Sequence, residues 1–377
     1  MTASIQNSNK FQLIIQTNSP GELAAWARPL ILTCRQDYPD CIITICLVPC
    51  QYATGNEASV ARSIPGVHEV LTPKQTLLFL CGLHPSPKKA DHGAVLCLGG
   101  DPIYTQALGF RCGFSRNIYT EHKNKPGWFF NNIFYKHIHG DLMKSRINHY
   151  QNQAVDKKQL LTHYHLPDRP YLLLFLGSRP QHFKAYGRFV LETLPLFLET
   201  QDTVDILIGI APTITDDLVE LLDLKSFGSR VHCIRGNSLD FMTIASCMVS
   251  LPGTNTAEAM YMHLPMATVL PLNRPDLLAL DGLLGLMGSL PLLGGFIKRL
   301  ALAYLRKKTR FVSLPNRIAD KPMVPEWISV LDPQKFSDLL VRFVSNKQHL
   351  QTIKQDLQSL EHSQSVDQLI IKTIIQN

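Results

Sequence analysis

Two carboxylates follow strand-like apolar runs, where a side chain could take part in chemistry. Glu22 ends the stretch "TNSPGE" (Thr17–Glu22), and Asp101 lies in "LGGDPIYTQ" (Leu98–Gln106). A carboxylate at such a point can accept a proton from an incoming hydroxyl group. Both also have a purely structural explanation, because Asp before proline is a common helix N-cap and an acidic residue favours the first helical turn.

The stretch "FLGSRPQHFK" (Phe175–Lys184) places an arginine after a strand-like run and a Gly-Ser turn, Gly177-Ser178. Backbone N–H groups at the start of a helix attract anions, and the guanidinium of Arg179 offers a fork that fits phosphate. The sequence therefore predicts a phosphate contact at Arg179. The alternative is an arginine that is simply solvated at a surface turn.

The stretch "SLPGTNTAEAM" (Ser250–Met260) is a second candidate for anion binding. Gly253 and Thr254 open a predicted helix and leave bare N–H groups and a hydroxyl for a phosphate, while Glu258 could hold a ribose hydroxyl. A capping arrangement explains part of the pattern without a ligand. Neither corner carries a P-loop or Gly-x-Gly-x-x-Gly pattern, which speaks against ATP hydrolysis and nicotinamide chemistry.

Strand-like and helix-like segments alternate along the whole chain. Uninterrupted apolar runs are typical of parallel strands that are covered on both faces. The polar stretch Lys144–Gln159 interrupts the pattern and predicts a domain boundary. We expect an α/β protein with two doubly wound, Rossmann-like domains facing a cleft: residues 1–150, residues 151–345, and C-terminal helices over 346–377. The predicted strands are Phe11–Thr17, Cys41–Val48, Gly93–Gly100, Asn117–His122, Tyr171–Gly177, Asp205–Pro212, Arg230–Gly236, Cys247–Gly253 and Pro265–Pro271.

The stretch "FVSLPNRIADKPMVPE" (Phe311–Glu326) is rich in rigid and polar residues. We expect it to begin as a short apolar strand that stops at Pro315 and Asn316. Since ligands bind at strand ends in open α/β sheets, this stretch is a further candidate for ligand binding.

Three of these stretches carry a resemblance to a known family. "LGSR", "SLPGTNTAEAM…LPMATV" and especially "FVSLPNRIADKPMVPE" resemble, in order and spacing, the C-terminal half of lipid-A-disaccharide synthases. Those proteins are inverting glycosyltransferases of the two-domain GT-B type. They transfer an acylated glucosamine from UDP to an acylated sugar phosphate at the inner membrane surface.

The resemblance implies roles for individual residues. Arg179 matches the arginine that contacts the UDP diphosphate, Asn316 the asparagine of the nucleotide site, and Glu258 the glutamate of the Gly-Thr helix. It further implies a UDP-sugar donor, a lipid or glycolipid acceptor, and a cytoplasmic protein held at the inner face of the membrane. No cofactor is expected, and no metal either, because the chain has no Asp-x-Asp motif.

The N-terminal half departs from the family pattern, which puts the acceptor and the base in question. The family's opening Gly-Glu-x-Ser-Gly-Asp is replaced here by a segment containing Pro20, Gly21 and Glu22, which we place on the acceptor side. The family's catalytic aspartate falls on Gly100, with Asp101 one residue later. We therefore expect Asp101, and second to it Glu22, to deprotonate the acceptor hydroxyl.

Composition fits this picture. The net charge of +7 is compatible with phosphates or acidic lipids, and no basic stripe with interleaved aromatics points to nucleic acid. The apolar segment 277–310 ends in interleaved leucines and cations, which is typical of a helix in a membrane interface. Its alternative is a core or dimer-interface helix with a solvated basic end. The nine cysteines lack regular spacing and Met1–Lys10 has no apolar core, so we expect reduced thiols and no secretory signal.

Two other functions remain open at this stage. One is another UDP-sugar enzyme, such as a UDP-N-acetylglucosamine 2-epimerase, which needs several acid and base groups around a single sugar. The other is a non-catalytic relative that binds a nucleotide-sugar or a lipid, in which Asp101 and Glu22 would point away from the cleft.

Overall fold

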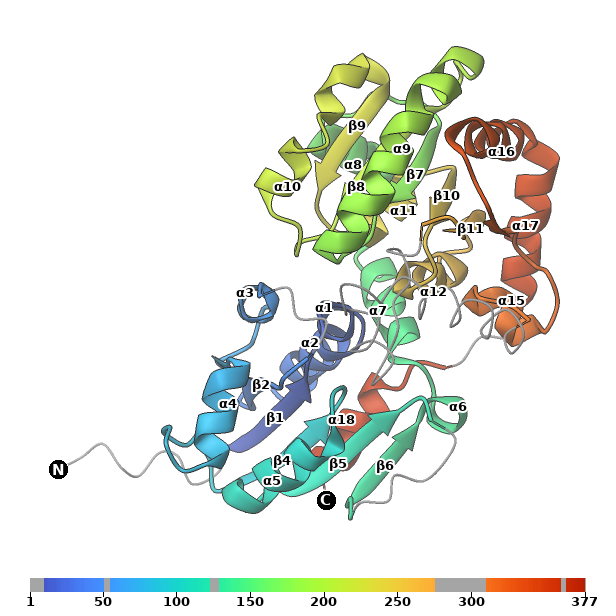
Figure 1. Cartoon of the computed structure of the whole chain (residues 1–377). Coiled ribbons are helices and arrows are strands. Elements are labelled where there is room, and N and C mark those ends of the chain that lie inside the picture. Colours follow the sequence, from blue (N-terminus) through green and yellow to red (C-terminus); the bar gives the residue numbers. More distant parts are fainter. Residues whose placement is uncertain (1–9, 51–54, 123–128, 275–309, 361–363, 377) are drawn as a thin grey trace. The chain divides into compact units, whose positions relative to one another are not determined.

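The computed structural model describes residues 10–50, 55–122, 129–274, 310–360 and 364–376 (Figure 1). The chain divides into two compact units. Unit 1 comprises residues 1–153 and 362–377, and unit 2 comprises residues 154–361.

Unit 1 is built on a six-stranded parallel sheet in the order β3-β2-β1-β4-β5-β6. The central strands are apolar along their length, as expected for strands covered on both faces. The chain starts in the middle of the sheet, builds outward to β3, then returns past β1 to build the other half. The strands are β1 (Phe11–Thr17), β2 (Ile42–Leu47), β3 (Glu69–Leu71), β4 (His92–Cys97), β5 (Ser115–Thr120) and β6 (Asn132–Tyr135).

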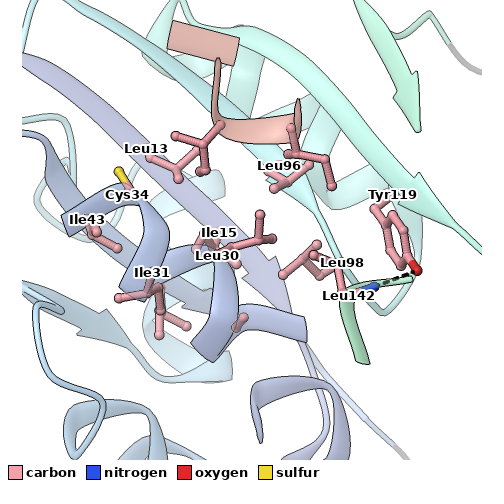
Figure 2. Close-up of a cluster of buried hydrophobic side chains, with 14 of the residues drawn as sticks. Leu13, Ile15, Leu30, Ile31, Cys34, Ile43, Leu96, Leu98, Tyr119 and Leu142 are labelled. Carbon is pink, nitrogen blue, oxygen red and sulfur yellow. Dashed lines mark hydrogen bonds between the residues drawn. The ribbon is translucent and has the colours of Figure 1, made fainter. Parts of the chain in front are cut away.

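Helices cover both faces of the unit 1 sheet. On one face, α2 and the C-terminal helix α18 pack over Leu13, Ile15 and Leu96 of the central strands (Figure 2). On the other face, a smaller core forms between the sheet and α4 and α5, around Phe79 and Leu108. The helices are α1 (Pro20–Glu22), the π-helical turn η1 (Leu23–Ala27), α2 (Arg28–Asp37), α3 (Glu57–Arg62), α4 (Pro73–Leu80), α5 (Pro102–Cys112), α6 (Lys136–His139), α7 (Leu142–Gln151) and α18 (Asp367–Gln376).

Unit 2 repeats the same topology. Its six-stranded parallel sheet has the order β12-β11-β10-β7-β8-β9, so its first strand, β7, is again central. The strands are β7 (Tyr171–Phe175), β8 (Asp205–Ile210), β9 (Val231–Arg235), β10 (Cys247–Ser250), β11 (Met266–Pro271) and β12 (Glu326–Ser329).

The longest helix of the described residues, α9, packs against α16 in unit 2 through aromatic rings. Phe189 and Phe336 stack with their ring centroids 5.1 Å apart, and Trp327 meets Phe336 edge-on at 6.2 Å. The helices of this unit are α8 (Lys157–His163), α9 (Pro180–Thr200), α10 (Asp216–Glu220), the 3-10 segment η2 (Leu224–Arg230), α11 (Ser238–Ile244), α12 (Thr254–Tyr261), α15 (Leu314–Ala319), α16 (Pro333–Ser345) and α17 (Lys347–Ser359).

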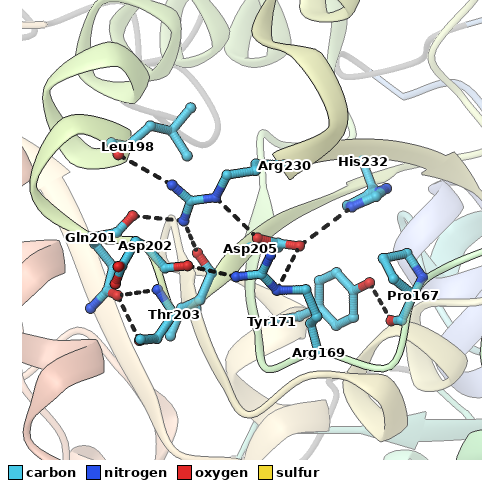
Figure 3. Close-up of polar contacts among 11 residues, drawn as sticks. Pro167, Arg169, Tyr171, Leu198, Gln201, Asp202, Thr203, Asp205, Arg230 and His232 are labelled. Atoms are coloured by element: carbon cyan, nitrogen blue, oxygen red, sulfur yellow. Dashed lines mark hydrogen bonds and ion pairs between the residues drawn. The ribbon is translucent and has the colours of Figure 1, made fainter.

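A buried carboxylate ties together the amino-terminal ends of β7, β8 and β9 (Figure 3). Asp205 is 1% exposed, and its two oxygens lie 3.2 Å from Arg230 Nε and 3.3 Å from Arg169 Nε. The Arg230 guanidinium also donates to three backbone carbonyls, including that of Gln201 at 2.6 Å. A buried charge needs such partners. This cluster lies at the amino-terminal ends of the strands, whereas ligands of open α/β sheets bind at the carboxyl-terminal ends. We therefore assign it a structural role.

A second polar cluster fastens the C-terminal helix to unit 1. Asp367, at the start of α18, accepts hydrogen bonds from Thr33 of α2 and, at 2.7 Å, from Ser365. Its Oδ2 also lies 2.8 Å from Nε2 of His149 on α7. Ser145 Oγ accepts from the backbone N–H of Asp367 at 3.3 Å. These bonds lower the pKa of Asp367 despite its burial, which on its own would raise the pKa.

The predicted fold class is confirmed in its two doubly wound α/β units. Within 346–377, α17 lies in unit 2 and α18 in unit 1. Three short edge strands, β3, β6 and β12, were not predicted. The prediction of a strand beginning at Phe311 is wrong: Ser313 occupies the N-cap position of helix α15, and Pro315 fits the first turn of that helix.

We predict that Asp367→Asn destabilises unit 1 by about 3 kcal/mol at neutral pH, because it breaks a buried, hydrogen-bonded charge cluster. A carboxylate with a lowered folded-state pKa contributes stability that is fully present above its unfolded pKa, about 3.9. The difference between variant and wild type should therefore shrink as the pH falls below 4 or so. Hydrogen exchange of unit 1 amides over a urea series measures the free energy of unfolding of unit 1 in each variant. The control is Asp40→Asn, at an exposed position in the same unit, and equal effects of the two variants would contradict the prediction.

Candidate functional site

In both units the order in which strands are added to the sheet reverses between two neighbouring parallel strands, β1 and β4 in unit 1 and β7 and β10 in unit 2. Ligands of open α/β sheets bind at the carboxyl ends of the strands at such switch points. The four corners singled out in the sequence follow these four strands. Thr17–Glu22 follows β1, Leu98–Asp101 follows β4, Gly177–Arg179 follows β7, and Leu251–Thr254 follows β10.

The carboxyl group of Glu22 lies directly against the corner that follows β4. A Cβ atom added to Gly99 would sit 1.8 Å from Glu22 Oε2, so only glycine leaves room for this contact. Oε2 also accepts hydrogen bonds from Thr17 Oγ1 at 3.2 Å and from the backbone N–H of Asn18 at 3.3 Å. The neighbouring Gly100 adopts φ +80°, which favours glycine, and its backbone lies close to Asn18 and Val48.

Burial raises the pKa of Glu22, and hydrogen bonds from Asn18, Thr17 and Ser19 offset part of that rise. A carboxylate that is poorly solvated in its charged form is a stronger base than one in water. It also retains lone pairs for a further donor, since an ionised carboxylate offers about four acceptor positions. The group can therefore accept a proton from a hydroxyl placed at this edge.

Asp101 has a different environment. It is exposed, and its Oδ1 accepts a hydrogen bond from Ile103 N at 2.9 Å, which caps α5. The capping explanation is thus the one that its geometry supports. Pro20 and Gly21 form the first turn of α1, ahead of Glu22, and the chain continues into the π-helical turn η1. Short π-helical turns are frequent at functional sites.

In unit 2, Arg179 occupies the N-cap position of α9 with an extended backbone and makes no capping bond with its side chain. Gly177 makes the turn out of β7, and the carbonyl of Ser178 accepts a hydrogen bond from Thr213 Oγ1 at 2.6 Å. Thr213 follows β8, so this bond links two neighbouring strand ends and fixes the loop that carries Arg179.

The corner after β10 opens helix α12 with Gly253 at its N-cap, where no side chain caps the first N–H groups. Gly253 and Thr254 are exposed, and Thr256 Oγ1 donates to the Gly253 carbonyl at 2.7 Å. The register of β10 with β7 places this corner beside the Arg179 loop. Glu258, by contrast, is only 3% exposed, so its side chain lies inside the unit rather than with the exposed groups of the same helix.

Asn316 is 1% exposed and its amide bonds entirely within its own segment. Its Nδ2 donates to the Val324 carbonyl and to Glu326 Oε1, each at 2.9 Å, and its Oδ1 accepts from the N–H groups of Met323 and Val324. Glu326 also accepts from Ser313 N and Oγ. The four bonds fill the capacity of the amide. The side chain of Asn316 thus holds the loop 313–326 together. Helix α15 in that loop packs against α12.

The structure therefore divides these predicted residues into three groups. Glu22 lies at the unit 1 switch point, and Gly177, Ser178, Arg179, Gly253 and Thr254 lie at the unit 2 switch point. Asn316 and Glu258 are buried behind the second site. The segment 277–310 lies outside the described residues except for Arg310. Within the described residues, no helix has the length and hydrophobicity that crossing a membrane requires.

Sequence reasoning missed two polar residues behind the first site, Gln16 on β1 and Thr105 on α5, both fully buried. One signal was available for Gln16. A glutamine inside an apolar parallel strand has to find partners for its amide, which marks it as part of a specific hydrogen-bond arrangement.

Comparisons with known proteins agree with the sequence motifs. The lipid-A-disaccharide synthase of Blochmanniella floridana is 26% identical over 200 residues, which cover 52% of this chain and 46% of that protein. The enzyme of the same name from Azoarcus sp. (strain BH72) is 22% identical over 200 residues, covering 52% and 45%. The chain thus spans about half the length of the curated relatives it matches. No family model matches the chain.

Solved structures with a similar fold include UDP-GlcNAc 2-epimerase from Neisseria meningitidis bound to UDP-GlcNAc. It has a TM-score of 0.52 and 14% identity, covering 98% of this chain and 100% of that one. The Methanocaldococcus jannaschii enzyme in complex with UDP-GlcNAc and UDP has a TM-score of 0.52 and 12% identity, with the same coverage. At these identities the likeness shows the fold alone. The sequence motifs and the matched relatives show that this chain is similar to the lipid-A-disaccharide synthases, and its two doubly wound units give it a GT-B-type fold.

Proposed function

We propose that the chain is an inverting glycosyltransferase. It transfers a glucosamine-type sugar from a UDP-sugar to a lipid or lipid-linked sugar acceptor at the cytoplasmic face of a membrane. The observation that carries the proposal is the chemistry of the two switch points. One holds a desolvated carboxylate, Glu22, and the other holds Arg179 beside the uncapped start of α12.

In the proposed reaction Glu22 removes the proton from the acceptor hydroxyl. The hydroxyl oxygen attacks the anomeric carbon of the donor, a new C–O bond forms, and the bond between that carbon and the diphosphate breaks on the opposite side. This single displacement inverts the configuration. Glu22 replaces Asp101 as the first candidate for the base, because Asp101 is exposed and caps α5.

The leaving diphosphate gains negative charge as the bond breaks, and fixed positive groups lower the energy of that state. Arg179 can grip it with its guanidinium, and the first N–H groups of α12 can add hydrogen bonds. Asn316 supports this arrangement indirectly, because it orders the loop whose helix α15 packs against α12. The names of the matched relatives support a lipid-linked acceptor. The interleaved leucines and cations at the end of the segment 277–310 support that segment as the membrane contact.

We predict that Glu22→Gln lowers kcat/KM by 10²-fold or more, as the loss of a general base does, and removes the acidic limb of the pH profile. Because a raised folded-state pKa makes the ionised form costly, Glu22→Gln should be at least as stable as wild type at neutral pH. The comparison variant is Asp101→Asn, which retains the cap of α5. Loss of transfer in Asp101→Asn with normal transfer in Glu22→Gln would reverse the assignment.

We predict that Arg179→Ala lowers kcat by roughly 10² to 10³, the usual effect of removing one group that stabilises transition-state charge. The variant removes no cap from α9, because the Arg179 side chain makes no capping bond. Arg188→Ala, at an exposed position on the same helix, is the matched control. Steady-state kinetics with thermal unfolding of each variant provides the measurement, and unchanged turnover in Arg179→Ala would remove the diphosphate role.

The function itself is tested by incubating the protein with labelled UDP-sugars and a membrane lipid extract. We expect label to move from a UDP-glucosamine derivative into a lipid-soluble product with inverted anomeric configuration. Conversion of UDP-N-acetylglucosamine to its 2-epimer without an acceptor would instead identify an epimerase. Binding of UDP in a thermal-shift assay, with neither reaction, would identify a non-catalytic relative.

A further inference from the structure

Gln16 lies at the end of β1, fully buried, and its side-chain amide reaches across to the corner after β4. Its Nε2 donates to the Gly99 carbonyl at 2.8 Å and to the Asp101 carbonyl at 3.1 Å. Its Oε1 accepts from Thr105 Oγ1, one turn into α5. One amide thus clamps both ends of the Gly99–Asp101 turn and anchors that clamp to the helix that follows.

This turn is the surface on which the Glu22 carboxyl rests. The position of a Cβ on Gly99 would be only 1.8 Å from Glu22 Oε2, so the backbone of the turn covers the carboxyl group closely. A displacement of the turn by even a fraction of an ångström would therefore change how much water reaches Glu22. Gly100 adds a second constraint, because its backbone packs against Val48 and Asn18.

We propose that Gln16 is a positioning residue: it holds the Gly99–Asp101 turn against the Glu22 carboxyl, and thereby keeps water away from that group and fixes its orientation. The effect on catalysis rests on the proposed function. The contact between the turn and the Glu22 carboxyl does not depend on that function. Without the clamp the turn relaxes outward, the carboxyl gains solvent, and the base becomes weaker and less well placed.

The same strand supplies a matched control. Gln12 is also fully buried, and its amide donates to Thr44 Oγ1 at 2.9 Å and to the Pro87 carbonyl at 2.7 Å, while its Oε1 accepts from Lys89 N at 2.7 Å. It therefore makes three hydrogen bonds, close to the four of Gln16, whose Nε2 also donates to Cys97 Sγ at 3.6 Å, and it lies at the opposite end of β1. Gln12→Leu and Gln16→Leu should cost comparable stability, and only the second should affect Glu22.

The test measures the titration of the Glu22 carboxyl by ¹³C NMR of side-chain-labelled glutamate, with the signal assigned by its absence in Glu22→Gln. We expect Gln16→Leu to lower the pKa of Glu22 toward the ordinary glutamate value and Gln12→Leu to leave it unchanged. In the transfer assay, Gln16→Leu should move the acidic limb in the same direction and lower kcat about tenfold or more, as misplacement of a catalytic group does.

A milder pair of variants serves if the leucine variants do not fold. Thr105→Val removes one anchor of the Gln16 amide, and Thr76→Val removes a buried hydroxyl that has no hydrogen-bond partner among the described residues. An unchanged Glu22 titration in both Gln16→Leu and Thr105→Val overturns the proposal. If the titration shifts as expected but wild type transfers no sugar, the positioning role stands and the proposed function fails.

Discussion

The contact between the Glu22 carboxyl and the backbone of Gly99 constrains much of unit 1. It requires a residue without a side chain after β4, a sheet order that places the parallel strands β1 and β4 side by side, and hydrogen bonds that compensate a partly buried charge. A desolvated carboxylate is costly in a folded protein unless it is used or well compensated. The partial compensation found here is the physical reason to regard Glu22 as functional.

The second unit has the same topology but places different chemical groups at its switch point. Its switch point gathers one guanidinium and bare N–H groups, and the charged group that it buries most deeply, Asp205, lies at the opposite end of the sheet. Positive groups at one edge and a compensated ion cluster at the other show a division of labour within one sheet. The carboxyl ends of the strands leave Ser178, Gly253 and Thr254 exposed, whereas the amino ends hold the buried ion cluster around Asp205.

The strand-rich cores of both units were predictable because parallel strands buried on both faces leave long apolar runs, as in β1 and β7. The strands β3, β6 and β12 were not, because an edge strand of three or four residues leaves no periodic signal. The positions of the candidate site residues at strand ends were predictable, because unusual residues follow the apolar runs there. The sequence could not distinguish Asp101 from Glu22, since exposure and contact with Gly99 depend on tertiary structure. Asn316 illustrates the same limit. It belongs to a sequence motif, but its side chain is buried and holds a loop together through hydrogen bonds.

The polar cluster that receives α18 has a consequence for biosynthesis. Thr33, Ser145 and His149 belong to the early part of the chain, whereas Asp367 is translated only after all of unit 2. Until then, the core of unit 1 lacks the apolar side chains of α18, among them Ile370 and Ile371. Unit 1 therefore cannot complete its core during translation before unit 2 has been synthesised. In the nascent chain, unit 1 remains incompletely packed while unit 2 leaves the ribosome.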